Sequence, residues 1–177
     1  MDQQTDSYRI RLARPNEVPR LQEIEDEAGT IFSGLGLIHQ ALDVSFPLDD
    51  LARLVGMGQV WVGCQEDGLL VGMVIASVRE GAAYVEEMDV LPEHGRRGLG
   101  ARLLACVCAW AKAQGHAAVT LSTFRDVPWN GPFYRKQGPA ARGVDTGHAG
   151  DPRERIAARP LCRGAGVHAS GRDRRRG

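Results

Sequence analysis

The sequence predicts a mixed α/β fold, in which one central, mostly antiparallel sheet carries helices on both faces. The first observation is a meander of three strand-like segments, separated by short turns, in the middle of the chain. The second is a set of helix-like segments before and after this meander, which are most simply accommodated on both faces of one sheet. The third is size, because 177 residues with 43% hydrophobic content suffice for one domain with a core.

The first third of the chain predicts one strand and two helices. Residues 8–13 alternate between apolar and polar with period two, as expected of a strand. A helix is expected from about residue 17, and residues 48–55 form a short amphipathic helix that ends at Gly56. Between these helices, residues 29–46 mix glycines with large apolar side chains, which indicates a long loop or a broken helix.

The rest of the expected fold follows from apolar side chains that recur with the period of a strand (two residues) or of a helix (about 3.6 residues). Three strands are predicted at residues 59–64, 69–78 and 83–90. The second of these is mostly apolar and is expected to be buried on both faces. Residues 98–114 then place an apolar face at helical spacing, and Gly115 ends that helix. A short strand at residues 117–121 and a short helix at residues 132–137 complete the order.

Several classes of protein are excluded by composition. The longest apolar run has ten residues, whereas a membrane-spanning helix needs about 20. Residues 1–6 contain neither a basic region nor an apolar stretch, so no secretory signal is visible. The four cysteines form no CxxC pair and have no metal-ligand spacing. We therefore expect a cytoplasmic protein with reduced thiols and no metal site.

The total charge is neutral, but the charge is distributed unevenly between a long acidic segment and a short basic one. The chain has 22 basic and 22 acidic side chains, but residues 1–138 hold 13 basic and 18 acidic ones. Residues 139–177 hold nine arginines, four acidic residues and few large aliphatic side chains. Such a segment buries too little apolar surface to offset the entropy of ordering its backbone. The predicted folded domain is therefore residues 7–138, followed by an Arg/Gly/Ala-rich tail.

The stretch from Val90 to Ala101 carries the strongest chemical signal. A strand ends at Val90, a loop with Arg96 and Arg97 follows, and a helix begins at about Gly98. The first N–H groups of a helix are unpaired and carry partial positive charge, and glycines let a diphosphate approach the backbone. The residues predict an anion-binding cradle. The alternative is a plain glycine-rich turn with solvated arginines, which the glycine spacing alone does not exclude.

Two common nucleotide-binding motifs do not fit this loop. A dinucleotide fingerprint requires a third glycine at the position of Leu103. A phosphate-binding loop of the NTPase type requires Lys followed by Ser or Thr, but Ala101 and Arg102 stand there. Any anion bound here is therefore held by a different kind of loop.

The stretch resembles the GNAT superfamily of acetyl-CoA-dependent N-acetyltransferases. In that family, a strand ending in Val is followed by Pro and by (Arg/Gln)-x-x-Gly-x-(Gly/Ala) at the start of a long helix. The matching residues here are Val90, Pro92, Gly98 and Gly100. Gly95 departs from the pattern, and Arg96 and Arg97 can supply the missing charge. Tyr134, followed by Gly138, is similar to the family's late Tyr and Gly, and the order of elements agrees.

The resemblance implies a GNAT-like sheet that splays after its fourth strand, with acetyl-CoA as co-substrate. Tyr134 is then the general acid that protonates the departing thiolate, and a half-buried packing tyrosine is the alternative. The residues implied to bind the coenzyme are Met88, Asp89 and Val90 as a strand edge, Arg96, Arg97, Gly98, Leu99, Gly100 and Ala101 around the pyrophosphate, and Asn130 ahead of the last helix.

The general base is expected on the third strand of the meander. Glu86 and Glu87 are adjacent, so strand alternation predicts that they point to opposite faces. Glu86 lies on the Val90 side, where polyamine-type members of the family carry an acidic residue, and is our candidate for the base. A salt-bridged strand carboxylate is the alternative for Glu86, and Glu87 is expected to be structural. With Asp89, these residues favour a cationic small-molecule or peptide amine as acceptor.

The predicted activity is transfer of acetyl to a primary amine by direct attack in a ternary complex. No residue stands out as an acyl-carrying nucleophile, and a homodimer stays open. A non-catalytic module that binds acyl-CoA is the second hypothesis. A nucleic-acid-binding protein that uses the arginines of residues 139–177 is the third, and we rank it last because that segment lacks aromatic residues for stacking.

Members of the family continue beyond the late Tyr and Gly with two further strands. Here nothing after Gly138 alternates with period two over five residues, so these C-terminal strands are expected to be missing. Residues 139–177 are then either a natural disordered extension or the product of a single-base frameshift near codon 138. Arg, Gly, Ala and Pro are the residues that GC-rich codons encode out of frame.

Overall fold

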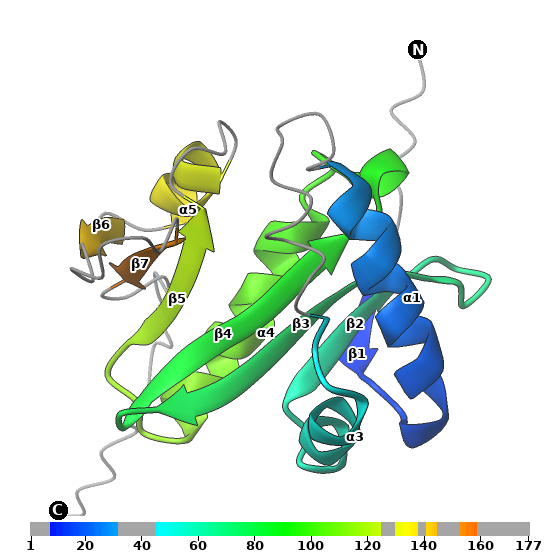
Figure 1. Cartoon of the computed structure of the whole chain (residues 1–177), viewed down its shortest axis with the longest axis horizontal. Coiled ribbons are helices and arrows are strands. Elements are labelled where there is room, and N and C mark those ends of the chain that lie inside the picture. Colours follow the sequence, from blue (N-terminus) through cyan, green and yellow to red (C-terminus); the bar gives the residue numbers. More distant parts are fainter. Residues whose placement is uncertain (1–7, 32–44, 125–129, 138–140, 145–152, 159–177) are drawn as a thin grey trace, which may run out of the picture.

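The computed structural model describes residues 8–31, 45–124, 130–137, 141–144 and 153–158 (Figure 1). In chain order the elements are β1 (Arg9–Leu12), η1 (Pro15–Glu17), α1 (Val18–Gly29), α3 (Leu48–Gly56), β2 (Val60–Cys64), β3 (Leu70–Arg79), β4 (Ala82–Val90), η3 (Pro92–His94), α4 (Leu99–Ala113), β5 (Val119–Phe124), α5 (Asn130–Gln137), β6 (Ala141–Val144) and β7 (Arg153–Ala158). Most of the expected loop between residues 29 and 46 lies outside the described residues.

The strands form one sheet in the order β1-β2-β3-β4-β5-β7-β6. Every neighbouring pair is antiparallel except β4 and β5, which run parallel. A parallel pair needs a crossover connection, and α4 provides it between these two strands. The predicted α/β fold with a mostly antiparallel sheet is therefore confirmed.

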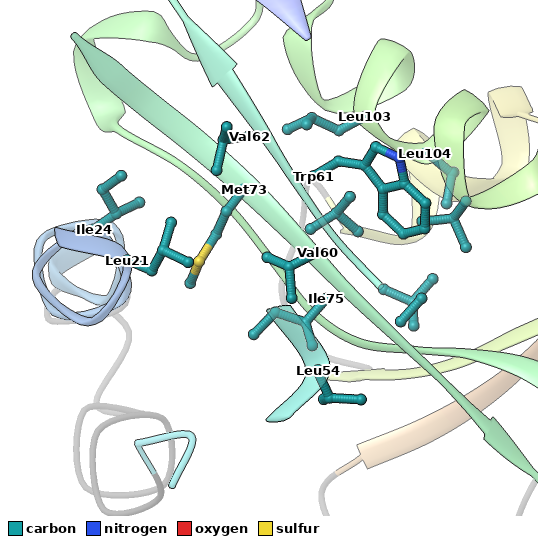
Figure 2. Close-up of a cluster of buried hydrophobic side chains, with 14 of the residues drawn as sticks. Leu21, Ile24, Leu54, Val60, Trp61, Val62, Met73, Ile75, Leu103 and Leu104 are labelled. Atoms are coloured by element: carbon teal, nitrogen blue, oxygen red, sulfur yellow. The ribbon is translucent and has the colours of Figure 1, made fainter. Parts of the chain in front are cut away.

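Helices cover both faces of the sheet, and the core lies on both sides of β2 and β3. Figure 2 shows Leu21 of α1 beside Met73 on one side of the sheet, and Leu103 of α4 beside Trp61 on the other. Trp61 also meets Trp110 of α4 edge to face, with ring centroids 6.1 Å apart. Burial of these large side chains on both faces fixes α1 and α4 on opposite sides of the sheet.

Two glycines decide where α4 begins on the sheet. Gly63 and Gly72 are directly opposite each other on β2 and β3. A Cβ on Gly63 would lie 2.6 Å from Leu99 Cδ1, and one on Gly72 would lie 3.3 Å from Leu99 Cδ2. The missing side chains thus leave a hollow for Leu99, the fully buried first residue of α4. The start of α4 is held against the sheet beside the end of β4.

A β-bulge interrupts β4 at Glu86. Val85 pairs with Ala76 of β3, and Glu87 pairs with the next residue, Ile75. Glu86 is therefore an extra residue on β4, and a bulge of this kind shifts the alternation of side chains along the strand.

The sheet opens between β4 and β5. The parallel pairing joins Ala83 to Val119, Tyr84 to Thr120 and Val85 to Leu121, and it stops there. Both strands continue, and Figure 1 shows them diverging, with β5 running toward α5 and β4 away from it. Among the described residues, no strand pairs with positions 86–90 of β4 on this side, which leaves a free strand edge. The splay that the family resemblance implied is present.

Two C-terminal strands that we expected to be missing are present. β7 pairs with β5 from Phe124↔Arg153 to Val119↔Ala158, and β6 pairs with β7. Strand pairing uses backbone N–H and C=O groups, so it does not require the apolar alternation that this segment lacks. The expectation of missing strands is therefore wrong. Residues 159–177 lie outside the described part of the chain, and the tail assignment stays a prediction.

A test at the DNA level addresses the origin of residues 139–177. A single-base shift near codon 138 predicts that a neighbouring frame encodes apolar residues with period two soon after Gly138. Resequencing the gene and translating its other two frames checks this. Early stop codons, or no alternating segment in either frame, would contradict the frameshift and leave a natural extension.

Candidate active site

The N-terminus of α4 is bare and faces the opening in the sheet. Gly98 occupies the N-cap position with φ +82°, a left-handed conformation that glycine adopts without strain, and as a glycine it has no side chain to cap the helix. The first intrahelical bond runs from Arg102 N to Gly98 O. The N–H groups before Arg102 therefore have no partner within the helix. Arg96 and Arg97 are exposed beside them, so positive charge surrounds these donors.

A buried histidine anchors the loop before α4 through a hydrogen bond. His94 is buried, and its Nδ1 lies 2.8 Å from the hydroxyl oxygen of Tyr8. Arg102 of α4 donates from Nη2 to the carbonyl oxygen of Tyr8 at 2.7 Å. His94 thus connects the loop to Tyr8, the residue just before β1.

The unpaired edge of β4 offers backbone groups at two positions. Leu91 N donates to Val71 O, which makes Leu91 and Val71 a hydrogen-bonded pair. In an antiparallel ladder such pairs alternate, so the backbone groups of Asp89 point to β3 and those of Met88 and Val90 point away from it. Met88 and Val90 thus fit the expected role of a free strand edge, and the backbone of Asp89 does not.

The helix α5 approaches the start of α4 through Phe133. Phe133 lies against the start of α4, because a Cβ on Gly100 would be 3.4 Å from Phe133 Cζ and 3.9 Å from Met88 Cε. Tyr134 is buried and meets Phe133 edge to face, with centroids 5.0 Å apart. Asn130 is the first residue of α5. The structure thus brings the candidate residues Met88, Gly100 and Tyr134 to one place.

The hydroxyl of Tyr134 lies in an acidic environment. Burial raises its pKa well above the ordinary value, and the charges of Glu87 and Asp89 raise it further. Tyr134 therefore keeps its proton over the whole physiological range. A proton donor must hold a proton in the resting enzyme, so this environment is compatible with the expected role.

Glu86 lies in an ion pair rather than in the opening. Its carboxylate accepts hydrogen bonds from Ser77 Oγ and from Nη2 of Arg79, and Nε of Arg79 donates at 2.8 Å. Ser77 and Arg79 are on the same face of β3 as Ile75, the partner of Glu87. The bulge thus turns Glu86 and Glu87 to the same face, and the expectation of opposite faces is wrong. For Glu86, these contacts match the salt-bridged alternative.

Glu25 is a site residue that sequence reasoning did not select. It stands one turn after the buried Leu21 on α1, and Oε1 accepts the backbone N–H of Phe46 at 2.8 Å. Burial raises the pKa of Glu25, as does the charge of Asp26. The sequence did offer a signal for Glu25, because this carboxylate stands at a position of α1 where the helical spacing predicts an apolar side chain.

The carboxyl group of Asp89 is the most unusual group in this region. Asp89 is only 9% exposed, and its Oδ2 is buried without a hydrogen-bond partner among the described residues. Burial raises its pKa well above the usual range, and the nearby charges of Glu87 and Glu25 act in the same direction. Uncompensated buried charge costs stability, so a group in this position calls for a functional explanation.

Replacement of Asp89 by Asn is expected to stabilise the protein at pH 7, by about 1–3 kcal/mol. The raised pKa means that the native state binds more protons than the unfolded state above the unfolded pKa of about 3.9. The stability of the unsubstituted protein thus falls as pH rises from there through the native pKa, and the advantage of Asn fades below pH 4. Urea unfolding from pH 3.5 to 8 measures the difference.

The exposed Asp50, which pairs with Arg53 on α3, provides the control. Asp50→Asn is expected to change stability by less than about 0.5 kcal/mol at any pH. A destabilised Asp89→Asn protein at pH 7 would show that a cation already compensates the carboxylate.

The described part of the chain contains neither a cluster of metal-ligating side chains nor a helix that could span a membrane. No group of three or more His, Cys, Asp or Glu side chains among those residues is arranged to hold a metal ion. No helix among them combines the length and the apolar character that crossing a membrane requires.

A sheet split at a parallel strand pair, with a bare helix N-terminus beside the split, is the arrangement implied by the resemblance to acetyltransferases. Residues 22–138 match the model of the acetyltransferase (GNAT) family, and this match spans more than half of the chain. The chain therefore belongs to the GNAT acetyltransferase family.

Solved structures with the same fold include two N-acetyltransferases and Naa20. PaiA N-acetyltransferase from Thermoplasma acidophilum, in complex with coenzyme A, is 18% identical, with a TM-score of 0.71 over 86% of this chain and 99% of that one. The ribosomal-protein-S18-alanine N-acetyltransferase from Escherichia coli is 17% identical, with a TM-score of 0.61 over 85% and 90%. Naa20 from Chaetomium thermophilum, in complex with a bisubstrate analogue, is 17% identical, with a TM-score of 0.63 over 84% of this chain and 84% of that one. These likenesses show the fold.

Replacement of Gly100 by Val is expected to weaken coenzyme A binding about tenfold or more in Kd, which corresponds to about 1.4 kcal/mol. A branched side chain here would press on Phe133 and fill the space over the first N–H groups of α4. Calorimetric titration with coenzyme A measures the effect. Gly100→Ala is the control, since one methyl group fits at van der Waals distance. An unchanged Kd in folded Gly100→Val would refute the anion site.

Proposed function

We propose that the protein transfers acetyl from acetyl-CoA to a primary amine, by direct attack in a ternary complex. The observation that carries this proposal is the unpaired edge of β4, which leads to the bare N-terminus of α4 with Tyr134 buried beside it. A pantetheine arm has amide groups that can pair with a strand edge, and a pyrophosphate suits a helix N-terminus.

The coenzyme would be held mainly by backbone groups. The pantetheine arm would pair with the backbone of Met88 and Val90. The pyrophosphate oxygens would accept hydrogen bonds from the backbone N–H groups of residues 98–101. Arg96 and Arg97 are exposed beside this helix start and would add positive charge. Asn130, at the start of α5, stays a candidate for a further polar contact.

Two proton transfers accompany the reaction. The amine must lose a proton before or during attack, and the thiolate that leaves is stabilised by gaining one. We assign the donor role to Tyr134. We assign the base to Glu87, whose charge acts on the Tyr134 hydroxyl, in place of Glu86. Glu86 is engaged by Ser77 and Arg79.

Direct attack is favoured because the described cysteines are poor nucleophiles. Cys64 and Cys108 are buried, and Cys64 Sγ donates to the carbonyl oxygen of Arg9 at 3.3 Å. Burial raises the pKa of the Cys106 thiol, which lowers its thiolate fraction. An acyl-cysteine intermediate on any of these three therefore lacks support.

Mass-spectrometric screening of a panel of primary amines with acetyl-CoA tests the proposal. We expect a mass gain of one acetyl group on at least one amine and release of free coenzyme A. Gly100→Val provides the control, because its activity should fall with its coenzyme affinity. Coenzyme binding without transfer to any amine would instead support a non-catalytic acyl-CoA-binding module. The cytoplasmic location expected from the sequence stays a prediction.

A further inference from the structure

Two carboxyl groups on neighbouring elements each have a buried oxygen without a hydrogen-bond partner among the described residues. Glu25 on α1 and Asp89 on β4 belong to elements that pack together, and the charge of Glu25 acts on Asp89. One oxygen of each, Glu25 Oε2 and Asp89 Oδ2, is buried with no hydrogen-bond partner in the described ranges. None of the ion pairs described for the structure includes either residue.

A cation is the ligand that such a pair requires. A buried carboxylate is costly unless it is paired, and the negative charges of Glu87 and Glu25 add to the cost of ionising Asp89. No group of three or more His, Cys, Asp or Glu side chains in the described part of the chain is arranged around a metal position. An alkylammonium group has three N–H donors, so it can satisfy both free oxygens at once.

The reacting amine itself cannot meet this requirement throughout the reaction. It must be neutral to attack a thioester, and its product is an uncharged amide. A separate ammonium group of the same acceptor keeps its charge through substrate, transition state and product. We propose, on the basis of the acyl transfer proposed above, that Glu25 and Asp89 bind a second, non-reacting ammonium group, so that the preferred acceptor is an alkyl diamine or polyamine.

This subsite would also act on Tyr134. The charge of Asp89 is among the causes that raise the pKa of the Tyr134 hydroxyl. A bound ammonium offsets that charge and lowers the pKa, which makes Tyr134 a better proton donor to the leaving thiolate. Occupation of the subsite by the correct acceptor would thus prepare the acid for its step.

The test measures amine binding without any acyl donor. Diamines of three to six carbons are titrated into the full chain by calorimetry, each beside the amino alcohol of the same length, in which a hydroxyl replaces the second ammonium. For the best length, we expect the diamine to bind at least tenfold more tightly than its amino alcohol. Glu25→Gln and Asp89→Asn should each reduce this preference to less than threefold. Glu23→Gln, on an exposed position of α1, should keep it.

Binding assays separate this inference from the proposed activity. Equal affinity for diamine and amino alcohol, or no diamine binding at millimolar concentration, would overturn the subsite even if acetyl transfer to amines is observed. A preference that survives both Glu25→Gln and Asp89→Asn would overturn it as well. Displacement of the diamine by millimolar MgCl₂, lost in Asp89→Asn, would indicate a metal site instead. A diamine preference without acetyl transfer would support the subsite and refute the proposed enzyme.

Discussion

Tyr134→Phe is expected to lower kcat about 100-fold while it changes the Kd for coenzyme A less than twofold. The substitution removes one hydroxyl from a buried ring, so the contact with Phe133 stays and the fold is retained. The lost group is the only proton donor that we assign to the leaving thiolate. An interaction that forms only as charge develops on sulfur affects kcat rather than coenzyme binding. Steady-state kinetics with the best amine of the panel measures the change.

Tyr84 provides the matched control for this experiment. It is a second buried tyrosine, on the same face of β4 as Glu86, and its ring lies 4.2 Å from the guanidinium carbon of Arg79. Tyr84→Phe is expected to leave kcat within about twofold of the unsubstituted enzyme. If Tyr134→Phe behaves like Tyr84→Phe, the thiolate takes its proton from water and Tyr134 only packs.

The features that the sequence predicted well are those that local residues determine. The period of the apolar side chains identified the strands around Trp61 and Val74 and the helix that contains Leu103. The bare helix start was predictable for the same reason, because Gly98 supplies the left-handed cap without any distant contact. Because a strand, a loop with glycines and a helix follow one another here, the end of the strand and the start of the helix lie at the same end of the sheet.

The features that were not predicted depend on pairing between distant segments. A bulge exists only relative to the partner strand, so nothing in the order of Val85, Glu86 and Glu87 reveals which is the extra residue. The burial of Glu25 depends on packing of α1 against β4, which the sequence of α1 alone does not reveal. Pairing of β7 with β5 uses backbone groups, which are the same in every sequence.

The bulge leads to a test of which glutamate acts as the base. Glu87→Gln is expected to lower kcat about 100-fold, because the amide keeps the shape of the side chain but cannot accept the proton of the amine. Glu86→Gln is expected to change kcat less than about threefold, since the carboxylate of Glu86 already binds Arg79 and Ser77. The pair is closely matched: each variant replaces the same group at adjacent positions of β4.

Stability measurements distinguish the two variants by a second criterion. Glu86→Gln breaks the ion pair with Arg79, in which the Arg79 side chain is 51% and the Glu86 side chain 9% exposed, and should cost about 1–3 kcal/mol of unfolding free energy. Arg79→Gln should cost a similar amount and should equally spare kcat. A large loss of activity in Glu86→Gln with full activity in Glu87→Gln would return the base to Glu86. In that case Arg79 would have to release the carboxylate when the amine binds, and Arg79→Gln would raise activity instead of sparing it.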